Sequence, residues 1–150
     1  MSLIISALIS GAHIIGIILI GICLFLELFL FKRQLSAAQV KVLTKVDLGY
    51  LFAALLVLTT GLLRWFFFEK TALYYTDNWV FLIKLSLFIF IGILSIPPTL
   101  HYFKLARMKV PQQSQESFQK IRGYIRYEIF ILFFIPILAA FVARGFGIMN

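Results

Sequence analysis

Hydrophobic residues are gathered into four long blocks that are separated by short polar segments. The blocks run approximately over residues 3–31, 48–68, 79–103 and 124–146. Each supplies the ~20 apolar residues that a helix needs to cross ~30 Å of hydrocarbon at a rise of about 1.5 Å per residue. Because the connections are short, successive spans should be antiparallel neighbours. The pattern therefore predicts an all-α fold, an integral membrane antiparallel four-helix bundle that forms a single membrane domain over residues 1–150.

The composition also indicates a membrane protein. Hydrophobic residues make up 62% of the chain and charged residues 13%, whereas soluble domains are roughly half apolar and a quarter charged. The first block has no Lys or Arg before it and is longer than the ~7–15-residue apolar region of a signal peptide, so we interpret it as the first span. The one cysteine, Cys23, excludes an intramolecular disulfide, and the chain has no CxxCH motif for covalent c-type haem.

The polar segments carry signals for helix ends. Ser36 and Gln39 have the spacing of a capping box, which predicts a short surface helix, and Asp47 is a candidate N-cap for the second span. Pro111 suits a first helical turn, so we expect the fourth helix to begin near Gln112. We also expect the third span to end or kink at two adjacent prolines and the fourth to bend at one (Pro97, Pro98 and Pro136).

The net charge of +8 is concentrated in the first and third connecting segments and the adjoining helix ends. The basic residues there are Lys32, Arg33, Lys41, Lys45, Lys104, Arg107, Lys109, Lys120, Arg122 and Arg126. The positive-inside rule then predicts a multi-pass protein of the bacterial inner membrane with both termini in the periplasm. We expect this basic surface to meet anionic headgroups of the lipid bilayer, and we expect no nucleic-acid partner.

Three polar side chains lie inside the spans, in the outer half or at the midplane. By helical rise, His13 lies roughly 15 Å from the outer boundary, Arg64 about 6 Å and Lys84 about 7–8 Å. A lysine at the centre of a span costs about 2.5–3.5 kcal/mol on insertion scales. No acidic residue lies in the outer half of any span, so the two cations either extend to the headgroups or meet a bound anion. His13 reaches neither surface and is a neutral interhelical hydrogen-bonding group, a ligand or a proton carrier.

The surroundings of His13 favour a cofactor site. Ser10 and Gly16 are small residues that allow close helix contact and also leave room beside an imidazole for a flat ligand. Non-covalent b-type haem needs an axial imidazole and cations near its propionates. We assign His13 as the ligand of the haem iron, and Arg64 and Lys84 as the partners of the propionates or of an anionic substrate. A chlorophyll-like pigment, a quinone or a lipid headgroup could use the same residues.

The remaining polar residues suggest less chemistry. His101 lies roughly 18 Å from His13 along the membrane normal, so it cannot complete the same iron site. One histidine, one cysteine and scattered carboxylates do not form a zinc or copper set at ligand spacing. Glu27 and Glu128 lie toward the cytosolic ends of their spans, where we expect simple interfacial solvation. The alternative is a proton entry point that serves the site above.

The chain resembles a family of small bacterial inner-membrane proteins of unknown function. The likeness rests on the four-span layout and on the stretches HIIGIILIG and TTGLLRWFFFEKTALYYTDNWVFLIKLSLFIFIGILSIPPTL. Hallmarks of that family are an early membrane histidine, a GLLR segment, a KxxxxY stretch, a lysine in the third span and an S-I-x-P-T ending. The matching residues are His13, Gly61, Arg64, Lys70, Tyr75, Lys84, Ser95, Pro98 and Thr99.

A more distant resemblance is to HemJ, the four-helix membrane protoporphyrinogen oxidase, which pairs a first-span histidine with a third-span lysine and is associated with b-type haem. His13 and Lys84 stand at these two places, although HemJ's wider first-span pattern and its aromatic, arginine-rich following turn are not found here. The resemblance implies a haem-dependent membrane oxidoreductase with a quinone or porphyrin-like substrate and catalytic roles for Lys84 and Arg64. The alternative is a non-enzymatic protein that binds a lipid, quinone or anionic solute, or acts as an assembly factor. Either protein could be a homo-oligomer.

Overall fold

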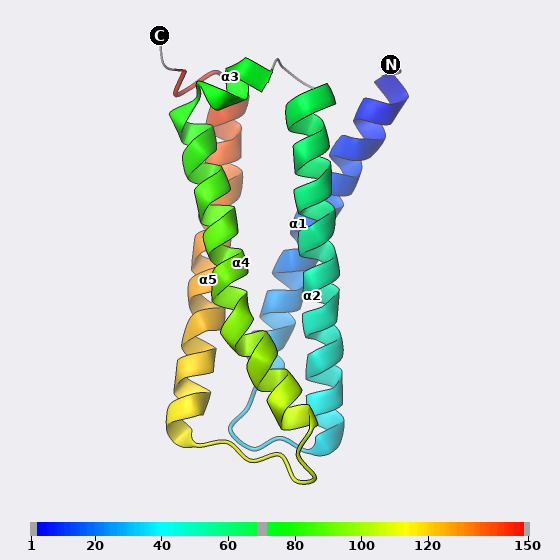
Figure 1. Ribbon diagram of the computed structural model, residues 1–150, viewed down its shortest axis with the longest axis vertical. Coiled ribbons are helices and arrows are strands. Elements are labelled where there is room, and N and C mark those ends of the chain that lie inside the picture. The colour runs from blue at the N-terminus through cyan, green and yellow to red at the C-terminus, as the bar shows by residue number, and fades with distance from the viewer. Residues whose placement is uncertain (1–2, 69–71, 149–150) are drawn as a thin grey trace.

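The four apolar blocks form four long helices in a computed structural model of the chain, which describes residues 3–68 and 72–148 (Figure 1). These are α1 (Leu3–Leu30), α2 (Ala37–Leu63), α4 (Trp79–Ala106) and α5 (Gln115–Ala143). A π-helical turn, η1 (Arg64–Phe68), and a short helix, α3 (Ala72–Thr76), lie between α2 and α4. Each long helix is long and apolar enough to cross a membrane. The predicted all-α four-helix membrane bundle is confirmed.

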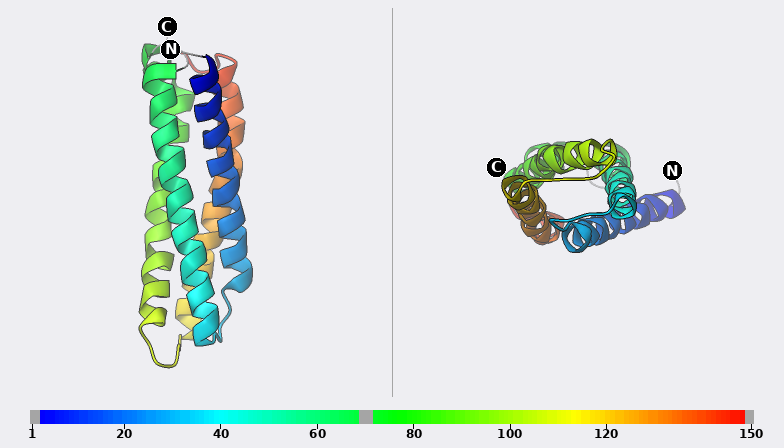
Figure 2. Two further views of the ribbon diagram at one scale, coloured as in Figure 1. Left: turned by 90° about the vertical axis from the view of Figure 1, so that its right-hand side faces the viewer. Right: turned by 90° about the horizontal axis from the view of Figure 1, so that it is seen from below.

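The helices form a ring of antiparallel neighbours. The closest packing is between α1 and α2 and between α4 and α5, and the two pairs meet through α2 with α4 and α1 with α5. Figure 2 shows this ring in the view from below. Both chain ends lie at one end of the bundle, which we call the terminal end (Figure 1). The connections over residues 31–36 and 107–114 lie at the other end, which we call the basic end.

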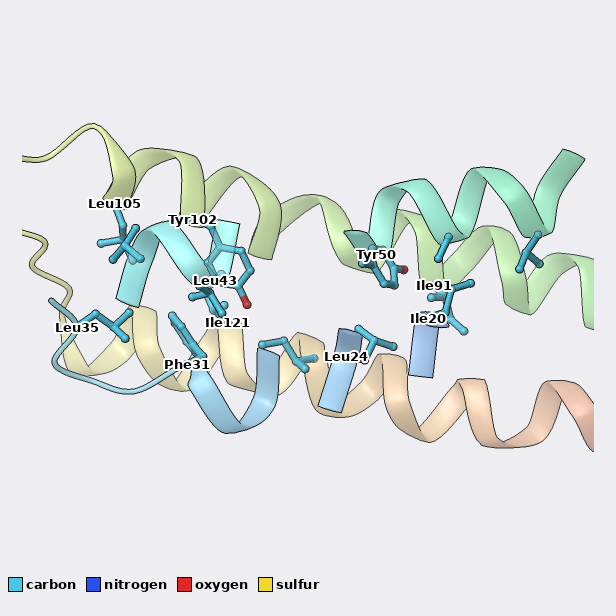
Figure 3. Close-up of a cluster of buried hydrophobic side chains, with 14 of the residues drawn as sticks. Ile20, Leu24, Phe31, Leu35, Leu43, Tyr50, Ile91, Tyr102, Leu105 and Ile121 are labelled. Atoms are coloured by element: carbon cyan, nitrogen blue, oxygen red, sulfur yellow. The ribbon is translucent and has the colours of Figure 1, made fainter. Parts of the chain in front are cut away.

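Two clusters of buried side chains hold the bundle together. The larger occupies the middle and the basic end, where Leu24, Phe31, Tyr102 and other side chains point between the helices (Figure 3). The smaller, at the terminal end, consists of Tyr75, Val80, Phe81 and Val142. Many Leu, Ile and Phe side chains on the outward faces are exposed, as a lipid-facing surface requires. Because lipid tails are as apolar as these side chains, close packing rather than water exclusion holds such helices together.

The second helix begins earlier than the hydrophobic block predicts. The capping box is confirmed: the Gln39 amide nitrogen donates to Ser36 Oγ (3.2 Å), and the Ser36 amide nitrogen donates to Gln39 Oε1 (2.8 Å). The box caps α2 itself, so the expected surface helix is the first part of α2. Asp47 is therefore not an N-cap. It lies inside α2 with 3% of its surface exposed, and the Thr99 hydroxyl of α4 donates to its Oδ1 (2.8 Å).

The structure excludes one of the two outcomes expected at the prolines of the third span, an end of the helix. α4 continues through Pro97 and Pro98 to Ala106, so the third span does not end there. Membrane helices tolerate such prolines where neighbouring helices support the freed backbone groups, and Pro98 is buried against the rest of the bundle. α5 begins at Gln115 rather than near Gln112, because Ser114 is the N-cap and accepts from the Ser117 amide (3.1 Å).

Candidate functional site

A cavity of about 580 Å³ lies between the two buried clusters, in the terminal half of the bundle. All four long helices, η1 and α3 contribute to its wall. The three polar residues that stood out inside the spans, His13, Arg64 and Lys84, all line it. Most of the remaining wall is apolar or aromatic. The fold therefore brings an imidazole and two cations from three different parts of the chain to one apolar enclosure.

His13 is held in place by α2. Its Nδ1 lies 2.9 Å from the Thr60 hydroxyl oxygen, and that hydroxyl in turn donates to the Leu56 carbonyl (2.6 Å). With the Thr60 proton directed to that carbonyl, the hydroxyl oxygen favours the neutral tautomer that donates through Nδ1–H and has its lone pair on Nε2. The ring lies close to Gly61, where an added Cβ would be 3.3 Å from His13 Cε1.

The contact between His13 and Thr60 is compatible with a structural role for His13 and with a role as a ligand. It is the interhelical hydrogen bond expected of a structural histidine. It is also the bond that a metal-ligating histidine commonly makes through its second nitrogen, which fixes the tautomer and the ring orientation.

The π-helical turn η1 follows α2 directly and carries Arg64 and Trp65 onto the cavity wall. π-Turns widen a helix by one residue and are frequent at functional sites. Lys84 reaches the same wall from α4, and its Nζ lies 5.1 Å from the centre of the Phe81 ring. Both cations are half-buried. Trp65 and Phe81 are in edge contact (5.0 Å between ring centres), so the ring that faces the Lys84 ammonium is itself packed against an indole.

The turn over residues 144–147, which follows α5 and which we call the last turn, fastens the rim of the cavity. Tyr74 donates to the Val142 carbonyl (2.9 Å), and the Asn78 side chain donates to the Phe146 carbonyl (2.8 Å). The Trp79 amide donates to the Gly147 carbonyl (3.0 Å). Asn78 is fully buried and also caps α4 by accepting from the Phe81 amide (3.0 Å). These bonds fix α3 and the start of α4 against the end of α5.

Other sequence candidates lie elsewhere. Ser10 and Gly16 are not among the described residues that line the cavity. Gly16 is at the α1–α2 contact, where an added Cβ would be 2.7 Å from Val57 Cγ2. His101 lies at the basic end, with its Nε2 3.0 Å from Gln113 Oε1 and its ring in edge contact with Phe31 (5.9 Å).

The expected interfacial solvation of Glu27 and Glu128 is wrong. Their side chains are 2% and 1% exposed, inside the bundle, and they interact with each other and with Asp47. The sequence does contain a signal for this burial, which is the helical spacing of each glutamate from buried apolar residues of its own helix. Glu27 follows Ile20 and Leu24 at the buried positions of α1, as Glu128 follows Ile121 and Ile125 in α5.

The comparisons with known proteins identify a family but no activity. Residues 5–147 match the family model described as "Predicted membrane protein (DUF2214)". No curated protein and no solved structure matches the chain. The description mentions neither a cofactor nor a reaction, so the likeness to HemJ stays a prediction.

Proposed function

Since the chain belongs to this family of predicted membrane proteins, we propose from the cavity itself that it is a redox protein of the membrane that binds b-type haem without covalent attachment. In this proposal His13 would hold the haem iron through its imidazole, and Arg64 and Lys84 would bind the propionates. The observation that carries it is the meeting of a hydrogen-bonded imidazole and two cations on the wall of one largely apolar cavity.

The residues present fit this group. The cavity volume of about 580 Å³ falls within the roughly 300–1,000 Å³ of small-molecule and cofactor sites. The Thr60 contact leaves the lone pair of His13 on Nε2, the nitrogen that would bind iron. A guanidinium and an ammonium make charge-assisted hydrogen bonds to carboxylates, and the propionates are carboxylates.

Each residue then has a defined task. Haem, when bound, supplies one-electron chemistry or binding of a small molecule at iron. His13 binds the iron and Thr60 orients the imidazole. Arg64 and Lys84 neutralise the propionates, or hold an anionic substrate in the catalytic role expected of them. The aromatic side chains of the wall, Trp65 and Phe81 among them, exclude water.

The test is a visible absorption spectrum of the purified full chain after expression with ample haem. We expect a Soret band from the wild-type protein, its loss in His13→Ala, and its retention in His101→Ala. His101 is a matched control, because it is a half-buried histidine of the same bundle that lies at the opposite end. A wild-type protein without a Soret band would contradict the haem proposal.

The apolar wall also favours a second occupant, a quinone or an anionic lipid or solute whose polar head meets Arg64 and Lys84. Solvent extraction and mass spectrometry of the purified protein separate the two. A co-purified quinone or lipid that is lost in the Arg64→Ala, Lys84→Ala double variant, with no Soret band in the wild type, identifies the non-enzymatic binding protein instead.

A further inference from the structure

Three buried carboxyl groups lie toward the basic half of the bundle, and none of them lines the cavity. Glu27 of α1, Asp47 of α2 and Glu128 of α5 are 2%, 3% and 1% exposed. Glu27 interacts electrostatically with the other two, and Glu128 interacts with Asp47. We call these three residues the acidic cluster. Half of the six acidic residues of the chain are therefore placed together in its interior.

Hydroxyl groups of α4 and α2 surround the acidic cluster. Tyr102, fully buried on α4, donates to Glu27 Oε2 (3.2 Å), and Thr99 donates to Asp47 Oδ1 (2.8 Å). The Tyr50 hydroxyl of α2 faces Glu128. Cys23, one turn before Glu27 on α1, is a further titratable group that interacts with the cluster, besides Tyr50 and Tyr102. All four long helices thus contribute a polar group to one enclosed place.

These hydrogen bonds leave several carboxyl oxygens of the acidic cluster without a donor. Oε1 of Glu27 and both oxygens of Glu128 are buried without a hydrogen bond of ordinary geometry among the described residues, although the Tyr50 hydroxyl interacts with Glu128. The basic residues nearest to the cluster's members in sequence, Lys32, Lys45 and Arg126, have exposed side chains. Three anions in an apolar interior repel one another and lose their hydration, a cost that a bound proton or cation removes.

A proton fits the geometry better than a metal ion. No group of three or more His, Cys, Asp and Glu within residues 3–68 and 72–148 is arranged to hold a metal. Two of the carboxyls already accept hydrogen bonds from hydroxyls of Tyr102 and Thr99. A protonated carboxyl can itself donate, which gives a hydrogen-bonding role to oxygens that otherwise lack one.

We propose that the acidic cluster is a proton-binding site, in which Glu27, Asp47 and Glu128 share bound protons and exchange them with the basic end of the bundle. The exchange moves a proton between carboxyl oxygens and water and changes no other bond. Glu27 is three residues from the end of α1, about 4–5 Å by helical rise, so the path to solvent at that end is short. This site does not depend on the occupant of the cavity.

Infrared spectroscopy tests the proposal on the full chain in a detergent without ester groups. At neutral pH we expect the carbonyl band of a protonated carboxyl, which shifts in D₂O and in protein carrying ¹³C-labelled glutamate carboxyls. Glu27→Gln and Glu128→Gln should each remove part of this band. Glu116→Gln, which changes an exposed glutamate in the first turn of α5, should leave it unchanged.

The wild-type spectrum decides the matter even if a variant does not fold. A wild-type protein without the protonated-carboxyl band at neutral pH would overturn the proposal. So would a band that appears only after sodium and potassium are removed, because the cluster would then be a cation site. A band that both glutamine variants keep in full would show that the protons are bound elsewhere.

Discussion

One hydrogen bond sets the chemistry available to His13. The Thr60 hydroxyl, which donates to the Leu56 carbonyl, lies 2.9 Å from Nδ1, and this contact favours the tautomer with its lone pair on Nε2. Thr60→Val keeps the shape of the side chain and removes the acceptor. We expect a loss of about 0.5–1.5 kcal/mol in stability, and a roughly 10- to 100-fold weaker haem affinity, the usual effect of losing such a partner.

Thermal unfolding and haem titration of the Thr60→Val protein check this expectation. Thr59→Val is the matched control, because the Thr59 hydroxyl is exposed and donates to the carbonyl of Leu55 in its own helix. Equal haem affinity in both variants would mean that Thr60 does not orient the ligand.

The cost of placing Lys84 in a membrane span is explained if its ammonium meets a bound anion. Lys84→Ala should then weaken haem retention without abolishing it, by about 1.5–3 kcal/mol for a charge-assisted hydrogen bond, or roughly 10- to 100-fold in affinity. The Arg64→Ala, Lys84→Ala double variant should lose more than either single variant. Lys104→Ala, at an exposed position of α4 in the basic half, should match the wild type. Unchanged haem retention in the double variant would show that neither Arg64 nor Lys84 helps to bind the haem.

At the scale of elements, the last turn of the chain depends on a glycine. Gly147 has φ 88°, and an added Cβ would be 2.5 Å from Val80 Cγ2 and 2.9 Å from Asn78 Oδ1. Gly147→Ala should therefore release the last turn from α4 and destabilise the cavity rim by about 1–3 kcal/mol. Hydrogen exchange at the Trp79 amide, which donates to the Gly147 carbonyl, reports the release.

Gly92→Ala is the control for this element. Gly92 lies in α4 with nothing within 4 Å of an added Cβ, so the change should be neutral or stabilising by up to about 1 kcal/mol. If Gly147→Ala leaves exchange at the Trp79 amide as slow as in the control, the last turn does not hold the rim.

The helices and their caps also show which features of the fold the sequence predicts and which it does not. Hydrophobic block length finds all four spans, and local spacing finds the Ser36–Gln39 cap. Asp47 has the residue type of an N-cap, but its partner is Thr99 on another helix, which no local pattern specifies. Depth places Arg64 and Lys84 at similar levels and His13 deeper, all in the outer half or at the midplane. The wall contributed by α5 depends on helix rotation, which depth does not determine.

The whole molecule has two polar centres at opposite halves of one bundle. The long helices have 27–29 residues, or about 40 Å each, which exceeds the ~30 Å of hydrocarbon by roughly 10 Å. The basic residues gather at the end away from both chain termini. We expect this end to face the cytosol, which would place the acidic cluster toward the cytosol and the cavity toward the periplasm.

A periplasm-dependent reporter fused after Asn150 tests this orientation. It should be active, whereas the same reporter inserted after Lys109, in the connection between α4 and α5, should be inactive. The opposite pair of results would place the cavity on the cytosolic side and would contradict the orientation but not the site.

The central claim is that His13 is the axial ligand of haem in the terminal-half cavity, and rescue by imidazole tests it most directly. His13→Gly removes the side chain and leaves space for a free imidazole beside Gly61. We predict that the purified variant lacks the Soret band of the wild type, and that haem with millimolar imidazole restores it. Imidazole should have no such effect on His101→Gly, which keeps its haem throughout. A His13→Gly protein that retains its haem without imidazole, or a wild-type protein that binds none, would contradict the claim.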